Sequence, residues 1–484
     1  MTNETSPLLP ENRSTHCVEY GLPKKTESTY DRFTPGQKRM ILALVSLAGM
    51  IPLFVIGSFV PCIPQISHDL RTTGTIIKQV ILCFCSTLAV SCYMVSGAFG
   101  NLTWSTYAGF YGRRPVYLTV LPIFAMGSFG VALARNVPQL MLFRVVQAFG
   151  GGGGMSVGAG VISDIYRLEQ RGGAMGVFFA ASLLGPSLSP IAGGLAARYA
   201  SWRVLQLALG ICGAALFVAI LLLLPETSWP RARGIDKLRK AGEPVNTRFT
   251  WLQNPFAHIS IFRSPNVVAA CVAGAFALSA NFTLLIPLSY TIGARYNIQN
   301  EVVIGALLLP GGLGSALGAP IAGRMSDRVV VRWREKRNGC LVPEDRLRAA
   351  LPGALILLPL SVLLSGVFTR YVSGTLGLVL NMGCLFVSGI GADVVLTPIA
   401  AYNVDILHGR SAEAFAVTSA LRHCITALAT ASFLPLINSV GVLATDSIAA
   451  GVALMSFVLL SITIRYGERM RAWKDVGFSI ESEH

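Results

Sequence analysis

Three charged side chains interrupt long apolar segments of this 484-residue chain, namely Arg144, Asp393 and Arg422. A charge at the centre of a membrane helix costs about 2.5–3.5 kcal/mol on insertion scales, so such residues usually serve a function. A carboxyl group can take up and release a proton, and a guanidinium can hold a carboxylate through two parallel hydrogen bonds. We therefore expect these three residues to bind a ligand or to transfer protons.

Asp393 and Arg422 are predicted to meet near the middle of a membrane. Asp393 lies 12 residues before Asp405, and Arg422 lies 12 residues after Arg410. At 1.5 Å per residue, both side chains lie about 18 Å from the same end of their helices. The connection is short, so the two helices should be antiparallel neighbours. The pair is either purely structural, or functional through a proton on Asp393 or a substrate on Arg422.

Two amide side chains are weaker candidates for substrate or proton contacts. Gln147 follows Arg144 by about one helical turn, so the two side chains should share a helix face. Asn281 lies in another apolar segment, where an amide usually forms a hydrogen bond with a neighbouring helix.

Apolar segments long enough to span a membrane carry these residues. The chain is 53% hydrophobic and 13% charged, whereas soluble domains average about 25% charged residues. Backbone groups in lipid must bond within their own segment, so each apolar segment should be a helix. The predicted spans cover residues 40–63, 76–100, 116–134, 139–163, 173–197, 204–225, 265–290, 302–322, 349–368, 373–401, 412–437 and 442–464. The predicted fold is an all-α membrane protein with twelve transmembrane helices in two six-helix bundles.

The distribution of lysine and arginine predicts the orientation of the chain. If both termini lie on one side, that side holds 30 of the 39 basic residues, the opposite loops hold seven, and two lie within spans. Because an excess of basic residues marks the cytoplasmic side, both termini should be cytoplasmic. The same asymmetry explains the net charge of +15 without a nucleic-acid partner.

A polar loop divides the spans into two sets of six. We expect a cytoplasmic N-terminal tail (1–39), a first helix bundle (40–225), a central cytoplasmic loop (226–264), a second helix bundle (265–466) and a cytoplasmic C-terminal tail (467–484). Such a repeat is typical of secondary transporters with a site near the midplane. The chain has no Walker A phosphate loop, so we do not expect ATP to power it. Its spans contain no HExxH motif and no paired carboxylates, and the chain has no CxxC pair, so we expect no enzymatic activity and no metal or other cofactor.

Several short motifs lie at or near the ends of spans or within them. They are Gly112-Arg113-Arg114-Pro115, Arg144-Val145-Val146-Gln147, Asp164-Ile165-Tyr166, the segment from Gly185 to Gly194, and Pro343-Glu344-Asp345-Arg346-Leu347. Over roughly residues 40–466, these motifs resemble the major facilitator superfamily, specifically its fungal twelve-span drug:proton antiporters. The resemblance implies proton-coupled export by alternating access.

The resemblance also implies gates at the cytoplasmic ends of both bundles. The residues concerned are Arg113, Arg114, Asp327, Arg328 and Asp405. In the family, an Asp-Arg pair precedes the Gly-Arg-Arg motif, and its aspartate holds the inward face shut through a charge contact. This chain has Gly109 and Phe110 at those positions, which predicts a weaker lock in the first half.

The fifth span is predicted to bend. Pro186 and Pro190 remove backbone donors, and Gly185 and Gly194 flatten one face of the helix. Such a helix suits the junction of two moving halves, and the alternative is a tightly packed helix without a moving role.

The charges also predict a class of substrate. Two arginines and one aspartate give the apolar spans a net charge of +1, which favours an organic anion over a cationic drug. For Arg144, the resemblance also implies an alternative, a structural arginine bonded to carbonyl groups of the first span. Some fungal members resemble dicarboxylate exporters, so the favoured substrate is an organic acid anion such as itaconate. The alternative function is a broad-specificity multidrug:proton antiporter.

The expected partners are a small-molecule substrate, protons and the lipid bilayer. We expect a monomer in the plasma membrane, with the vacuolar membrane as the alternative. A transporter-like receptor would carry a longer cytoplasmic tail than 467–484, and the two-fold layout favours a carrier over a channel.

Overall fold

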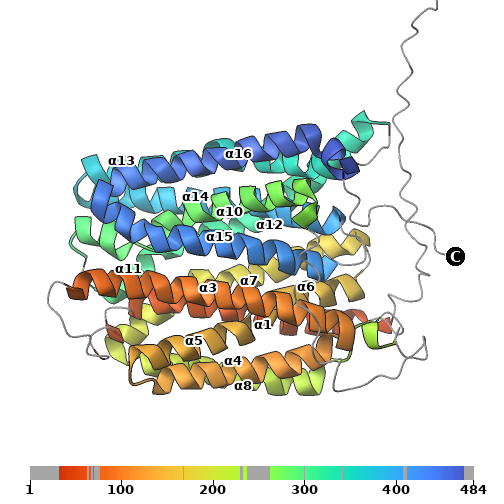
Figure 1. Ribbon diagram of the computed structural model, residues 1–484, viewed down its shortest axis with the longest axis horizontal. Coiled ribbons are helices and arrows are strands. Elements are labelled where there is room, and N and C mark those ends of the chain that lie inside the picture. The colour runs from red at the N-terminus through yellow and green to blue at the C-terminus, as the bar shows by residue number, and fades with distance from the viewer. Residues whose placement is uncertain are drawn as a thin grey trace, which may run out of the picture.

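The computed structural model describes residues 32–62, 65–66, 69, 77–166, 168–228, 233–236, 262–298, 300–338, 342–406 and 411–473. The described residues form long helices that lie side by side and include no β-strand (Figure 1). The first half contains α1 (Pro35–Phe59), η2 (Val60–Cys62), α3 (Ile77–Tyr111), α4 (Arg113–Leu133), α5 (Val137–Gly151), α6 (Gly153–Ile165), α7 (Leu168–Tyr199) and α8 (Trp202–Leu223). The second half contains α10 (Pro265–Leu285), η4 (Ser289–Gly293), α11 (Glu301–Leu307), α12 (Leu309–Lys336), η5 (Pro343–Ala350), η6 (Gly353–Leu357), α13 (Leu358–Tyr371), α14 (Gly374–Ile406), α15 (Ser411–Val440) and α16 (Val442–Trp473).

Each predicted span corresponds to a helix or to consecutive helical segments. Eleven helical stretches of the described chain are long and apolar enough to cross a membrane. The remaining predicted span, 76–100, overlaps α3 from Ile77 onward. The helix α3 continues to Tyr111 because helical hydrogen bonding persists beyond the apolar part that hydropathy detects. The prediction of an all-α membrane protein is confirmed.

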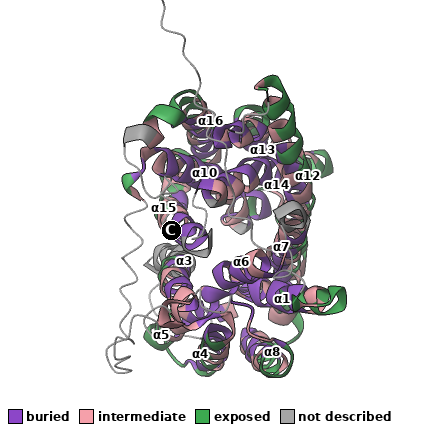
Figure 2. Ribbon diagram, turned by 90° about the vertical axis from the view of Figure 1, so that its right-hand side faces the viewer, coloured by how far each residue is buried: buried purple, intermediate pink, exposed green. Residues whose placement is uncertain are grey.

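Each half has a hydrophobic core of its own. The core of the first half extends from Ile41 to Leu224 in the sequence, and the core of the second half extends from Val267 to Leu460. Buried residues face the interior of each half, whereas many outward-facing residues are exposed (Figure 2). Exposed leucines on these outer faces are compatible with a membrane, because lipid tails are as apolar as leucine.

The two halves contact each other along two pairs of surfaces. The helix α3 packs against α15, and α7 packs against α11 and α12 (Figures 1 and 2). At the second contact, a Cβ atom added to Gly312 would collide with Ser187, and one added to Gly305 would collide with the carbonyl oxygen of Pro190. Such collisions show that the helix backbones approach closely across the junction of the halves.

The fifth span is tightly packed against its own half as well. A Cβ atom on Gly185 would lie 2.8 Å from the carbonyl oxygen of Met50 on α1. Gly193 and Gly194 are buried, and Pro186 and Pro190 lie within the continuous helix α7. Gly185 and Gly193 therefore face α1 within the first half, whereas Ser187 and Pro190 of the same helix face the second half.

Candidate functional site

Arg144 lies in the interior of the first half on α5, and its side chain is 0% exposed. Its guanidinium carbon lies 4.0 Å from the centre of the Phe59 ring and 4.6 Å from the centre of the Tyr93 ring. Aromatic rings stabilise a cation that stacks on their faces. The guanidinium donates one hydrogen bond, to the Gln147 side-chain oxygen at 3.3 Å, while Nε and Nη2 have no protein partner. The first span therefore supplies the Phe59 ring, rather than carbonyl acceptors, to this arginine.

Gln147 connects Arg144 to two other helices. Its side-chain nitrogen donates to Ser128 on α4 and to Gln206 on α8, each at 2.9 Å. All four polar side chains are at most 1% exposed. The predicted shared face of Arg144 and Gln147 is confirmed, and the hydrogen bonds of Gln147 hold one side of the guanidinium in place.

Asp393 and Arg422 lie on antiparallel neighbours, α14 and α15, but they do not form the predicted ion pair. Within the described chain, no nitrogen–oxygen distance of 4.0 Å or less joins them. Asp393 faces α12, where its Cβ lies 3.3 Å from the position of a Cβ added to Gly318. Arg422 packs against Gly274 of α10 and donates to Ser419 at 3.3 Å, which leaves its Nε without a partner. The two side chains therefore pack toward different neighbours, Asp393 toward α12 and Arg422 toward α10.

Asn281 connects two helices of the second half. Its side-chain oxygen accepts a hydrogen bond from Ser388 of α14 at 3.0 Å, and its side chain is 4% exposed. This bond agrees with the expectation of a contact with a neighbouring helix.

Asp446 is a buried acid that the sequence analysis missed. It lies on α16, it is 4% exposed, and it packs against Gly366 of α13. Asp446 could have been found from the sequence, because it is a charged residue inside the predicted span 442–464. With Asp446 included, these spans contain two arginines and two aspartates, so the net charge of +1 was wrong.

The second half carries a three-residue ion network at the predicted cytoplasmic ends of its helices. The Arg346 guanidinium contacts Asp327 of α12 at 3.1 Å and Asp405 of α14 at 2.7 Å. Arg346 belongs to the Pro343–Leu347 motif but was not predicted as a site residue. Arg328 is exposed and, among the described residues, has no ion pair. The arrangement links α12, η5 and α14.

The corresponding part of the first half has an ion pair of its own. Arg113 contacts Asp164 of α6 at 3.1 Å, while its Nη1 atom is buried without a partner. The side chain of Arg114 donates to the Leu221 carbonyl oxygen at 2.8 Å. Since the chain has Gly109 where the family has an aspartate, the weaker lock of the first half stays a prediction.

Glu226, which the sequence analysis did not select, caps the first turn of α4. Its carboxylate accepts the amide protons of Arg113 at 3.0 Å and Arg114 at 3.3 Å, where the helix dipole favours a negative charge. Burial alone would raise the pKa of Glu226, but hydrogen bonds from Ser228 and Arg113 and the charge of Arg233 outweigh it and lower the pKa. The start of the central loop is thereby attached to the gate of the first half.

Comparisons with known proteins identify similar chains. A model of the Major Facilitator Superfamily matches residues 42–431. The MFS antiporter QDR3 of Candida albicans is 24% identical over 91% of this chain and 79% of that protein. Citrate exporter 1 of Aspergillus niger is 30% identical over 44% of this chain and 39% of that protein. The crystal structure of the human organic anion transporter MFSD10 (TETRAN) aligns with 88% of this chain and with 100% of the MFSD10 chain, at a TM-score of 0.63. Because the two sequences are 17% identical, this similarity supports the fold alone.

Proposed function

This chain belongs to the Major Facilitator Superfamily, whose members are transporters rather than enzymes, and we propose that it exports an organic acid anion by proton-coupled alternating access. The observation that carries this proposal is the buried guanidinium of Arg144. Two of its nitrogen atoms lack a partner, and a buried unpaired donor costs about 1–3 kcal/mol, more for a charged group. A substrate carboxylate would accept hydrogen bonds from these nitrogens when the halves admit it.

Other features support the same proposal. The unpaired Nε of Arg422 offers a second donor in the opposite half, which suits a dicarboxylate such as itaconate. The similarity to citrate exporter 1 favours an organic acid. Asp393, which is 7% exposed and faces α12, is the proposed proton carrier.

We place the transporter in the plasma membrane as a monomer, with both termini in the cytoplasm. The second candidate is a multidrug:proton antiporter. The balance of Arg144 and Arg422 against Asp393 and Asp446 favours it, because these four residues together carry no net positive charge to repel cationic drugs.

Transport by purified protein in proteoliposomes tests the proposal directly. Labelled itaconate, citrate and a cationic dye are supplied under an imposed pH gradient. We expect Arg144→Lys, which keeps the charge but loses the planar fork, to reduce itaconate transport about tenfold, equivalent to about 1.4 kcal/mol. The matched control is Arg332→Lys at an exposed position on α12. Transport of the dye but not of either acid would establish the second candidate instead.

A further inference from the structure

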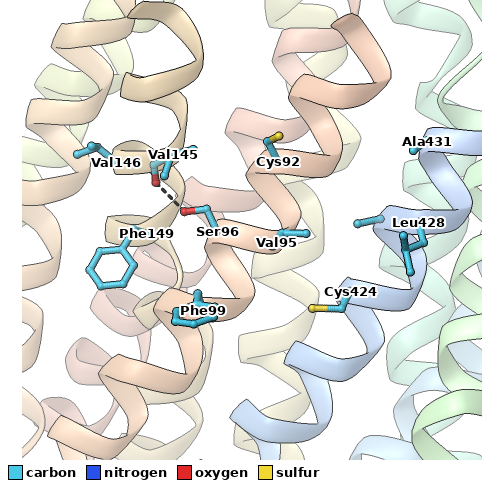
Figure 3. Close-up of a pocket in the computed structure, with 11 residues that line it drawn as sticks. Cys92, Val95, Ser96, Phe99, Val145, Val146, Phe149, Cys424, Leu428 and Ala431 are labelled. Atoms are coloured by element: carbon cyan, nitrogen blue, oxygen red, sulfur yellow. Dashed lines mark hydrogen bonds between the residues drawn. The ribbon is translucent and has the colours of Figure 1, made fainter. Parts of the chain in front are cut away.

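An apolar groove of about 670 Å³ lies between the two halves, apart from the buried charges described above. Its walls come from α3 and α5 of the first half and α15 of the second (Figure 3). Val95 and Phe99 project from α3, Phe149 from α5, and Cys424 and Leu428 from α15. The groove therefore bridges one of the two contacts between the halves.

The lining offers nothing to a charged or strongly polar ligand. No lining residue is charged, and the single hydroxyl group, on Ser96, already donates to the Val145 carbonyl oxygen at 2.7 Å. Apolar cavities of about 150 Å³ already stay dry and take up a benzene molecule. A groove of this size and composition fits a flexible hydrocarbon chain.

The position of the groove identifies the source of that chain. When α5 and α6 are taken as one membrane span (Val137–Ile165), the lining residue closest to a span end is Val145, eight residues or about 12 Å from Val137. Phe99 is 47% exposed and Leu428 is 75% exposed, so the groove opens on the outer surface of membrane-spanning helices. At this depth, the medium outside the protein consists of lipid acyl chains.

The two walls are built differently. Ser96 and Trp104 of α3 donate hydrogen bonds to the carbonyl oxygens of Val145 and Phe149 on α5, so these helices form one unit. The wall from α15 meets α3 through apolar side chains, including Ala427 and Met94. An occupant of the groove would therefore contact both halves of the transporter.

We propose that this groove binds one acyl chain of a bilayer phospholipid, which bridges the two halves. The inference is independent of the transported substrate. It is tested with the full-length protein in nanodiscs made of phosphatidylcholine with a photoreactive diazirine in one acyl chain. After illumination, mass spectrometry maps the lipid adducts along the chain.

We expect more adducts per exposed residue on segments 92–99 and 424–431 than on the outer face of α8. Ala431→Trp fills the groove, so adducts on segment 92–99 should fall about tenfold, equivalent to about 1.4 kcal/mol of binding free energy. Val218→Trp on α8, at a position that is 49% exposed outside the groove, is the matched control. Val95→Trp fills the groove from the opposite wall and replaces Ala431→Trp if that variant does not fold.

Three results would overturn the proposal. The first is an even spread of adducts over all lipid-facing helices. The second is an equal adduct yield in the groove-filling variant and the Val218→Trp control. The third is cross-linking of α3 or α15 to another copy of the chain at the expense of lipid adducts.

Discussion

Arg144 shows at the residue scale how a membrane helix accommodates a cation. Its guanidinium is enclosed by two aromatic rings and held on one side by Gln147, so part of its desolvation cost is offset. The remaining guanidinium nitrogens, Nε and Nη2, form hydrogen bonds only when a ligand supplies an acceptor. Asp393 presents the complementary case, because a carboxyl group in this setting can change its charge by binding a proton.

We expect Asp393→Asn to abolish export driven by a pH gradient while the protein still folds. An amide has nearly the same shape as the carboxyl group but cannot take up a proton, so substrate movement loses its coupling to the gradient. Flux into proteoliposomes with and without a pH gradient measures the effect, and counterflow of substrate shows whether binding survives.

Asp446→Asn is the matched control for this experiment, because it removes another buried carboxyl group of the second half. It should retain coupling. Normal gradient-driven export by Asp393→Asn, or loss of coupling in Asp446→Asn alone, would exclude Asp393 as the proton carrier.

The helices themselves could be predicted from the sequence, because the need for internal hydrogen bonds in lipid leaves few alternatives. The rotation of each helix could not be predicted, since consecutive residues point about 100° apart and packing against α10 and α12 decides which faces meet. Glu226 was not selected because a loop carboxylate gives no sequence signal for a helix N-terminus far away in the chain.

At the scale of one element, we expect Glu226→Gln to destabilise the start of α4 by about 1 kcal/mol, as for the loss of other helix caps. Because the folded-state pKa of Glu226 is lowered from 4.5, its stabilising effect is complete above that value and is lost as the pH falls through the lowered pKa. Thermal unfolding in detergent should show a difference between wild type and variant at pH 7 that shrinks at lower pH. The control Glu335→Gln changes an exposed carboxylate on α12, and an equal effect there would contradict the capping role.

The whole molecule combines two contacts between the halves with a different ion network at the predicted cytoplasmic side of each half. The backbones of α7 and α12 approach each other at Gly312, whereas α3 and α15 are separated locally by the apolar groove. The second half joins three elements through Arg346, but the first half leaves one nitrogen of Arg113 unpaired. We therefore expect the two halves to contribute different amounts to closing the predicted cytoplasmic side.

Gly109→Asp should strengthen the gate of the first half. Gly109 lies near the end of α3, and an aspartate there would offer the buried Nη1 of Arg113 a charged acceptor, worth about 1.5–3 kcal/mol for a buried bond. A transport cycle passes through states in which the cytoplasmic side is closed and states in which it is open. Stabilising the closed state slows this cycle, so we expect turnover to fall several-fold at saturating substrate. The control Gly109→Ala separates the effect of side-chain volume from that of charge. The double variant Gly109→Asp/Arg113→Ala should have the same turnover as Arg113→Ala alone. Equal turnover for Gly109→Asp and Gly109→Ala would show that the vacant nitrogen of Arg113 does not limit the gate.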